Sequence, residues 1–191
     1  MGIIALIISA MLVSNVVLVR FLGTCPFLGV SKKINNAIGL GLATMFVVFF
    51  SSLFSYGLYY GVLKPLGLEF LSLVSFILII ASFVQFVEMF LKKFIPSLYK
   101  SLGIYLPLIT TNCIVLGIAL EVIGNNFTFL ETIAYSLSVS AGFLLVLILF
   151  SIIRERVEAM NRVPQAFKGA AIALIITALM TMAFFGFQGL V

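Results

Sequence analysis

The chain has 191 residues, of which 63% are hydrophobic and 9% are charged, and its mean hydropathy is +1.32. Soluble domains average about 45–50% apolar and about 25% charged residues, so this composition predicts an integral membrane protein. The net charge of +5 comes from few basic residues set between hydrophobic stretches, which excludes nucleic-acid binding. The absence of histidine excludes imidazole chemistry and histidine-ligated haem within this chain alone.

Six apolar stretches are long enough to cross a bilayer, because a hydrocarbon core of about 30 Å takes about 20 residues of helix. They run over about 3–30, 37–63, 70–91, 102–120, 129–153 and 169–190. The first is interrupted at Arg20 and around 23–26, and the fourth is interrupted around 107–112. The sequence therefore predicts an all-α integral membrane fold with six transmembrane helices, which form one membrane domain over 1–191.

The basic residues predict how these helices are oriented. Nine of them follow helices one, three and five: Lys32, Lys33, Lys92, Lys93, Lys100, Arg154, Arg156, Arg162 and Lys168. The opposite connections carry one basic residue and three acidic ones: Lys64, Glu69, Glu121 and Glu131. Basic loops face the cytoplasm, so we expect the three basic connections there and both termini on the outside.

Six helices divide into two halves of three, about 1–95 and 96–191. Because each half crosses the membrane an odd number of times, the second half is inverted relative to the first. The interruptions fall at matching positions, in the first helix of each half. Broken helices at matching positions of inverted repeats usually mark the functional site of a membrane protein. We therefore expect helices one and four each to form two half-helices that frame such a site.

Each half carries one cysteine in the pattern Cys-x-x-Leu-Gly, at Cys25–Gly29 and at Cys113–Gly117, and the chain has no other cysteine. Pro26, directly after the first cysteine, suits the first turn of a helix. Thr24 and Asn112, directly before the two cysteines, are residue types that cap helices. Each cysteine would thus lie at the start of a half-helix, where the helix dipole favours the thiolate that binds metal.

Straight helices would keep these two thiols apart. Cys25 lies seven residues before Lys32 on the cytoplasmic side, and Cys113 lies eight residues before Glu121 on the outer side. At a rise of about 1.5 Å per residue, the two sulfur atoms would lie on opposite sides of the bilayer midplane. We therefore predict half-helices that stop near the membrane centre, where the cysteines can meet.

On the residues alone, three interpretations of the cysteines stay open. A buried cysteine often serves only as a small apolar residue, which is the commoner case, and a disulfide between Cys25 and Cys113 is a second possibility. The third is a redox site shared with another chain. An iron–sulfur cluster generally takes four cysteines, so a homologous partner with the same paired motif would have to supply two.

The cysteine motifs belong to a longer pattern. Residues 21–33 read FLGTCPFLGVSKK, 102–113 read LGIYLPLITTNC, 153–156 read IRER and 163–169 read VPQAFKG. This pattern covers essentially the whole chain and resembles the RnfA-type subunits of the Rnf electron-transport complex, in the NqrDE/RnfAE family. The NqrE-type subunits of the sodium-pumping NADH:quinone oxidoreductase are similar in architecture but match less well at Pro26.

The resemblance implies a subunit of a redox-driven ion pump in the inner membrane of bacteria or archaea. The complex would be a ferredoxin:NAD oxidoreductase that translocates Na⁺ or H⁺. An RnfE-like homologue would share a [2Fe–2S] cluster with this chain, and Cys25 and Cys113 would supply half of its ligands. The chain would relay electrons but would not be catalytic alone, and flavins would be held by the other subunits, which are RnfB-, RnfC-, RnfD- and RnfG-like. The residues around the cluster would be Gly23, Thr24, Pro26, Thr111 and Asn112.

Two charged residues are further candidates. Glu88 lies in the third apolar stretch, where a carboxylate is a functional candidate by default. It would line the ion path, or else pair with Lys92 one turn away near the interface. Arg20 would offset the negative charge of the cluster, or else lie against a neighbouring subunit or lipid.

Two other functions remain as alternatives to electron relay. The chain would be an inverted-repeat secondary transporter or permease subunit with no redox role, in which the broken helices bind a solute or cation. Otherwise it would be a structural membrane anchor for a complex. A reduced [2Fe–2S] signal that depends on both cysteines separates the redox subunit from both alternatives.

Overall fold

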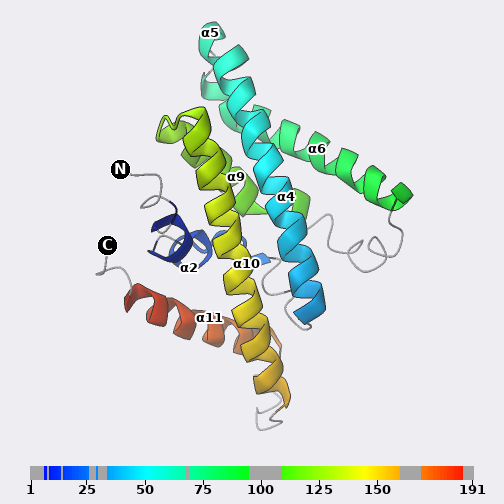
Figure 1. Cartoon of the computed structure of the whole chain (residues 1–191), viewed down its shortest axis with the longest axis vertical. Helices are drawn as coiled ribbons and strands as arrows, with labels where there is room; N and C mark the ends of the chain where they lie inside the picture. The colour runs from blue at the N-terminus through cyan, green and yellow to red at the C-terminus, as the bar shows by residue number, and fades with distance from the viewer. Residues whose placement is uncertain are drawn as a thin grey trace.

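The computed structural model describes Ile7, 9–13, 15–25, Gly29, 34–67, 69–94, 109–159 and 169–186. Within these ranges every ordered element is a helix and no strand occurs (Figure 1). The elements are the π-helix η1 (Ser9–Val13), α2 (Val16–Val19), α4 (Ile34–Leu58), the π-helix η2 (Tyr59–Leu63), α5 (Lys64–Leu66), the 3₁₀-helix η3 (Glu69–Leu71), α6 (Ser72–Phe94), α9 (Cys113–Gly124), α10 (Phe129–Ala159) and α11 (Ala170–Phe185).

Three helical stretches are long and apolar enough to cross a membrane. They are Ile34–Leu66, which joins α4, η2 and α5, Ser72–Phe90 in α6, and Phe129–Val157 in α10. The helices α9 and α11 are apolar but shorter. An all-α fold of apolar helices is therefore confirmed for the described residues, while the count of six spans and the inverted repeat stay predictions.

Some charged residues lie inside helices, although the sequence placed them in connections. Lys64 belongs to α5, Glu121 to α9, and Arg154 is buried within α10. A charge does not end a helix, because a long side chain can reach water or a partner while the backbone hydrogen bonds continue. The first long helical stretch ends instead at Gly67, whose left-handed backbone (φ 67°) suits a residue without a Cβ atom.

The helices α4 and α10 pack along each other as the central pair of the fold (Figure 1). Gly41 of α4 makes the approach possible, because a Cβ atom there would collide with the side chain of Leu144. Thr44 lies in the same buried region, and its hydroxyl donates to the Leu40 carbonyl at 2.8 Å. Such bonds within one helix satisfy a hydroxyl in apolar surroundings, so this pair is a close-packed scaffold.

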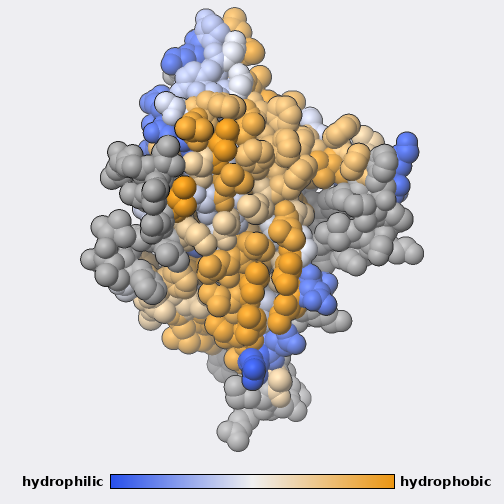
Figure 2. All heavy atoms as spheres, in the orientation of Figure 1, coloured by the Kyte–Doolittle hydropathy of each residue, from blue (hydrophilic) through white to orange (hydrophobic). Residues whose placement is uncertain are grey.

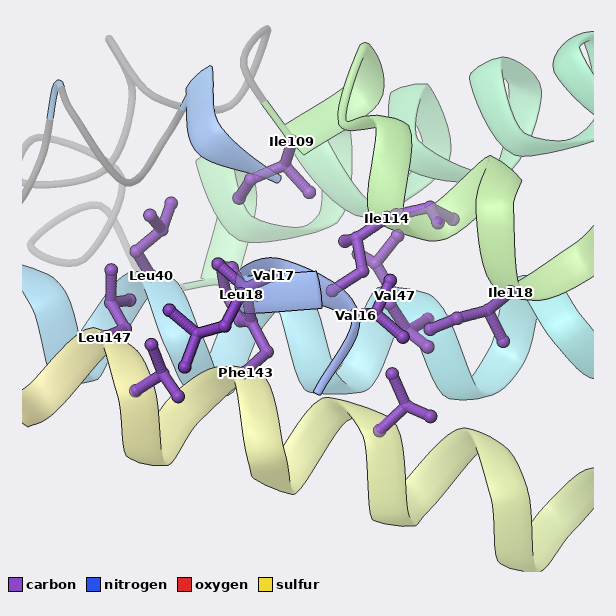
Figure 3. Packing of buried hydrophobic residues seen from close by; sticks show 14 of the residues in the cluster. Val16, Val17, Leu18, Leu40, Val47, Ile109, Ile114, Ile118, Phe143 and Leu147 are labelled. Carbon is purple, nitrogen blue, oxygen red and sulfur yellow. The ribbon is translucent and has the colours of Figure 1, made fainter. Parts of the chain in front are cut away.

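The short helix α2 is held in the core by packing. Its Val16, Val17 and Leu18 are buried. Figure 3 shows them among side chains of three longer helices, which include Leu40 and Val47 of α4, Ile114 of α9, and Phe143 and Leu147 of α10. Close van der Waals contact is the main force between helices in a membrane. It fixes the chain just before the first cysteine motif against α9.

The surface has the polarity that a bilayer requires. Figure 2 shows apolar residues over the middle of the visible face and hydrophilic residues towards its ends. The helix α6 leans away from the central pair (Figure 1), and its Phe86, Met89 and Phe90 are exposed. Large exposed apolar surfaces mark contact with lipid or with another protein, so α6 presents such a surface.

Candidate functional site

The first helix is interrupted on both sides of α2. Asn15 caps α2, because its Oδ1 accepts a hydrogen bond from the Val17 N–H at 3.2 Å. Its amide nitrogen donates to the carbonyls of Met11 and Gly142, both at 3.2 Å. After α2 the backbone turns through left-handed conformations at Phe21 (φ 54°) and Gly23 (φ 80°). Helical geometry resumes at Thr24 and Cys25.

The second interruption lies directly before α9. Asn112 has extended backbone (φ −70°, ψ 115°), and its Oδ1 accepts a hydrogen bond from the Ile114 N–H at 3.3 Å. The capping role predicted for Asn112 is therefore confirmed, and Cys113 is the first residue of α9. The side chain of Asn112 is 2% exposed, and its Nδ2 has no hydrogen-bond partner within the described part of the chain.

These two interruptions meet. The backbone N–H of Gly23 donates to Sγ of Cys113, with the nitrogen 2.9 Å from the sulfur. A Cβ atom at Gly23 would lie 3.2 Å from Cε2 of Phe143 and 3.5 Å from Oδ1 of Asn112. On the next turn of α9, a Cβ atom at Gly117 would lie 2.7 Å from Cδ1 of Leu22. Glycines on both sides thus let the two motifs approach closely.

The structure brings the two cysteines into one region without joining them. Both are free thiols, so the structure contains no disulfide between them, and Cys25 is exposed while Cys113 is half-buried. Consecutive Cα atoms are about 3.8 Å apart, so the Cα of Cys25 lies within about 8 Å of the Cα of Gly23, whose N–H contacts Cys113. The breaks therefore place the thiols near each other, which straight helices would not do.

The thiols alone make half of a metal site. Among the described residues, no group of three or more His, Cys, Asp or Glu side chains comes together. A [2Fe–2S] cluster generally takes four ligands, so two would have to come from outside this chain. The residues present fit that half, because an exposed thiol can reach a partner and the unpaired Asn112 amide leaves a buried donor beside the second thiol.

An ion pair connects the two interruptions a short way from the thiols. Nη2 of Arg20 lies 2.9 Å from Oε1 of Glu121, and the exposed fractions of the two side chains are 57% and 14%. Tyr135 of α10 contacts the same carboxylate. The second oxygen, Oε2, is buried without a hydrogen-bond partner in the described ranges. Because the sequence placed Glu121 in an outer connection, this pairing was missed. The signal was two isolated opposite charges in apolar helices.

The other predicted residues lie in different surroundings. Thr24 is half-buried and, with Phe21, lines a cavity of about 310 Å³ against Thr177 and Thr181 of α11. Thr111 is exposed in the turn before α9, and Pro26 lies outside the described residues.

Glu88 is half-buried on α6. No hydrogen bond or ion pair found in the described part of the chain joins it to the cysteine motifs. The structure therefore leaves its predicted place on an ion path untested.

The profile of the Rnf-Nqr subunit family of membrane proteins matches residues 3–191, which is nearly the entire chain. The chain belongs to the Rnf-Nqr family. Its close relatives include proteins named as the A-type component of the ion-translocating oxidoreductase complex. The one from Aliivibrio salmonicida is 56% identical over 186 residues, and the alignment covers 97% of this chain and 96% of the relative. Those from Vibrio cholerae (El Tor, strain N16961) and Vibrio campbellii are each 55% identical and cover 97% and 98% of this chain, and 96% and 97% of the relatives.

Proposed function

We propose that this chain is an electron-relaying membrane subunit of an ion-translocating oxidoreductase complex of the Rnf type. In this proposal Cys25 and Cys113 hold one half of a [2Fe–2S] cluster, and an RnfE-like homologue holds the other half. The observation that carries it is the contact between the Gly23 N–H and Cys113 Sγ, which joins the two cysteine motifs. The family and the names of the relatives support the type of complex.

The chain contributes a prepared pair of sulfur ligands. Cys113 begins a helix of 12 residues, and the free N–H groups at a helix N-terminus favour negative charge, here a thiolate. The N–H of Gly23 adds a direct hydrogen bond to the same sulfur. Cys25 is exposed, so its thiol can meet ligands from a second chain. The bound cluster would supply one-electron transfer.

The wider complex follows from the family. We propose that it couples electron transfer between ferredoxin and NAD to translocation of Na⁺ or H⁺. The flavins and the nucleotide site would belong to the RnfB-, RnfC-, RnfD- and RnfG-like subunits. The chain would lie in the inner membrane as a multi-pass protein with both termini outside.

The test is co-expression of this chain with an RnfE-like partner, followed by EPR spectroscopy of the dithionite-reduced complex. We expect a [2Fe–2S] signal in the wild-type complex that is lost in Cys25→Ser and in Cys113→Ser. Gly124→Ala, which meets open space at the end of α9, serves as the control and should keep the signal. A signal that survives either cysteine substitution contradicts the proposal.

One observation favours a second candidate, an inverted-repeat transporter without a redox role. Oε2 of Glu121 is buried and unpaired, and so are the hydroxyls of Ser51 and Ser55, one turn apart on α4. Unpaired buried oxygens can bind a cation. This candidate predicts a colourless, EPR-silent complex whose cation binding is lost in Glu121→Gln but kept in Cys113→Ser.

A further inference from the structure

We propose that the side-chain amide of Asn112 donates a hydrogen bond to the sulfur-bearing group that the two cysteines hold, and thereby raises the reduction potential of that group. This inference rests on the proposed function. It assigns to Asn112 a second role beside the cap of α9: that of a positioning and tuning residue whose nitrogen faces the cofactor.

The first argument is the uneven use of the Asn112 side chain. Its Oδ1 is occupied by the Ile114 N–H at 3.3 Å, and this bond fixes the orientation of the amide. Its Nδ2 carries two N–H donors that have no acceptor in the described part of the chain, although the residue is 2% exposed. A buried donor without an acceptor is costly, so such a group calls for a ligand.

The second argument is the position of the amide. Asn112 directly precedes Cys113, and Oδ1 of Asn112 lies 3.5 Å from the place that a Cβ atom would take at Gly23. The N–H of Gly23 itself donates to Cys113 Sγ. The Asn112 amide therefore belongs to the same wall of the site as Gly23. A bound cluster would bring sulfur atoms to this wall that the protein alone does not provide.

Asn15 shows what the same residue does without a ligand. It also caps a helix through its Oδ1. Its nitrogen, however, is used inside the protein, because it donates to the carbonyls of Met11 and Gly142 at 3.2 Å each. Two buried asparagines with the same capping role thus differ in one respect, which is whether the amide nitrogen has an acceptor. Asn15 is therefore a matched control.

Hydrogen bonds to the sulfur atoms are one of the factors that set the reduction potential of an iron–sulfur cluster. An N–H donor stabilises the more negative, reduced state, so its removal lowers the midpoint potential. A purely structural role for Asn112 would change the stability of α9 and leave the potential unchanged.

The experiment is an EPR-monitored redox titration of the co-expressed complex. Asn112→Ser keeps a capping oxygen and removes the amide donor, whereas Asn112→Asp keeps the shape and replaces the donor with a negative charge. We expect both to retain the cluster with a lower midpoint potential, and Asp to lower it more than Ser. Asn15→Ser should leave the potential unchanged. Wild-type potentials in both Asn112 variants would overturn the inference.

A second measurement covers variants that fail to assemble. The wild-type complex is produced with asparagine labelled with ¹⁵N at the side-chain nitrogen, and pulsed EPR searches for a ¹⁵N coupling to the reduced cluster. We expect a coupling in the wild-type complex and in Asn15→Ser. Its absence from both overturns the inference. A wild-type complex that contains no cluster contradicts the proposed function instead, so the two failures are distinguishable.

Discussion

At the scale of single residues, the site depends on glycines that let backbone replace side chain. Gly23 combines a left-handed φ of 80° with close neighbours on α9 and α10, and its N–H reaches Cys113. The sequence predicted that glycines near the cysteines would permit close approach. It could not predict which glycine donates to which sulfur, because that contact joins residues 90 positions apart.

Gly23→Ala should destabilise the protein and the first break. A left-handed backbone costs a residue with a Cβ atom about 1–2 kcal/mol, and the added methyl group would press on Phe143 at 3.2 Å. Thermal unfolding of the purified complex in detergent measures the loss. Gly57→Ala, on α4 with open space around it, is the control and should be neutral or slightly stabilising. Equal melting temperatures for Gly23→Ala and wild type would show that this backbone is not constrained.

At the scale of elements, the sequence predicted the interruptions well and the pairing between them poorly. Isolated polar residues in apolar stretches, Asn112 above all, mark where a helix must restart, because capping is a local property. The ends of helices that contain Lys64, Glu121 or Arg154 were placed wrongly, because charge was taken as a sign of a loop. Partners such as Arg20 for Glu121 depend on how two distant elements pack, which no local pattern encodes.

The Arg20–Glu121 ion pair should couple the two broken helices. Arg20→Met leaves a buried carboxylate without its cation, and Glu121→Gln leaves the cation without its carboxylate, so each should destabilise. The double variant should lose less than the sum of the two, by about 1 kcal/mol, which is typical of residues in direct contact. A double-mutant cycle on melting temperature provides the measurement. Strict additivity would mean that the 2.9 Å contact contributes nothing to stability.

At the scale of the whole molecule, composition was decisive. A chain with 63% hydrophobic residues had to become a bundle of apolar helices, because a bilayer leaves no other way to satisfy the backbone. The central α4–α10 pair and the apolar middle of the surface follow from that constraint (Figures 1 and 2). The inverted arrangement of two halves rests on the distribution of basic residues and on the repeated motif, and it remains a prediction about the molecule in its membrane.

Reporter fusions check this topology. We expect alkaline phosphatase to be active when fused after Val191, because both termini should lie outside. The same reporter inserted in the basic connection between Arg156 and Lys168 should be inactive, because that loop should face the cytoplasm. Green fluorescent protein at the two positions should give the opposite pattern. An inactive phosphatase at the carboxyl end, with fluorescence there, would reverse the predicted orientation.

The central claim is that two thiols, one from each half, hold iron together with a partner chain. Its most direct test is the iron and acid-labile sulfide content of the purified complex, compared with this chain expressed alone. The account predicts equal amounts of iron and sulfide in the complex, and neither in the chain alone, in Cys25→Ser or in Cys113→Ser. Iron and sulfide at the wild-type level in either cysteine variant would contradict it.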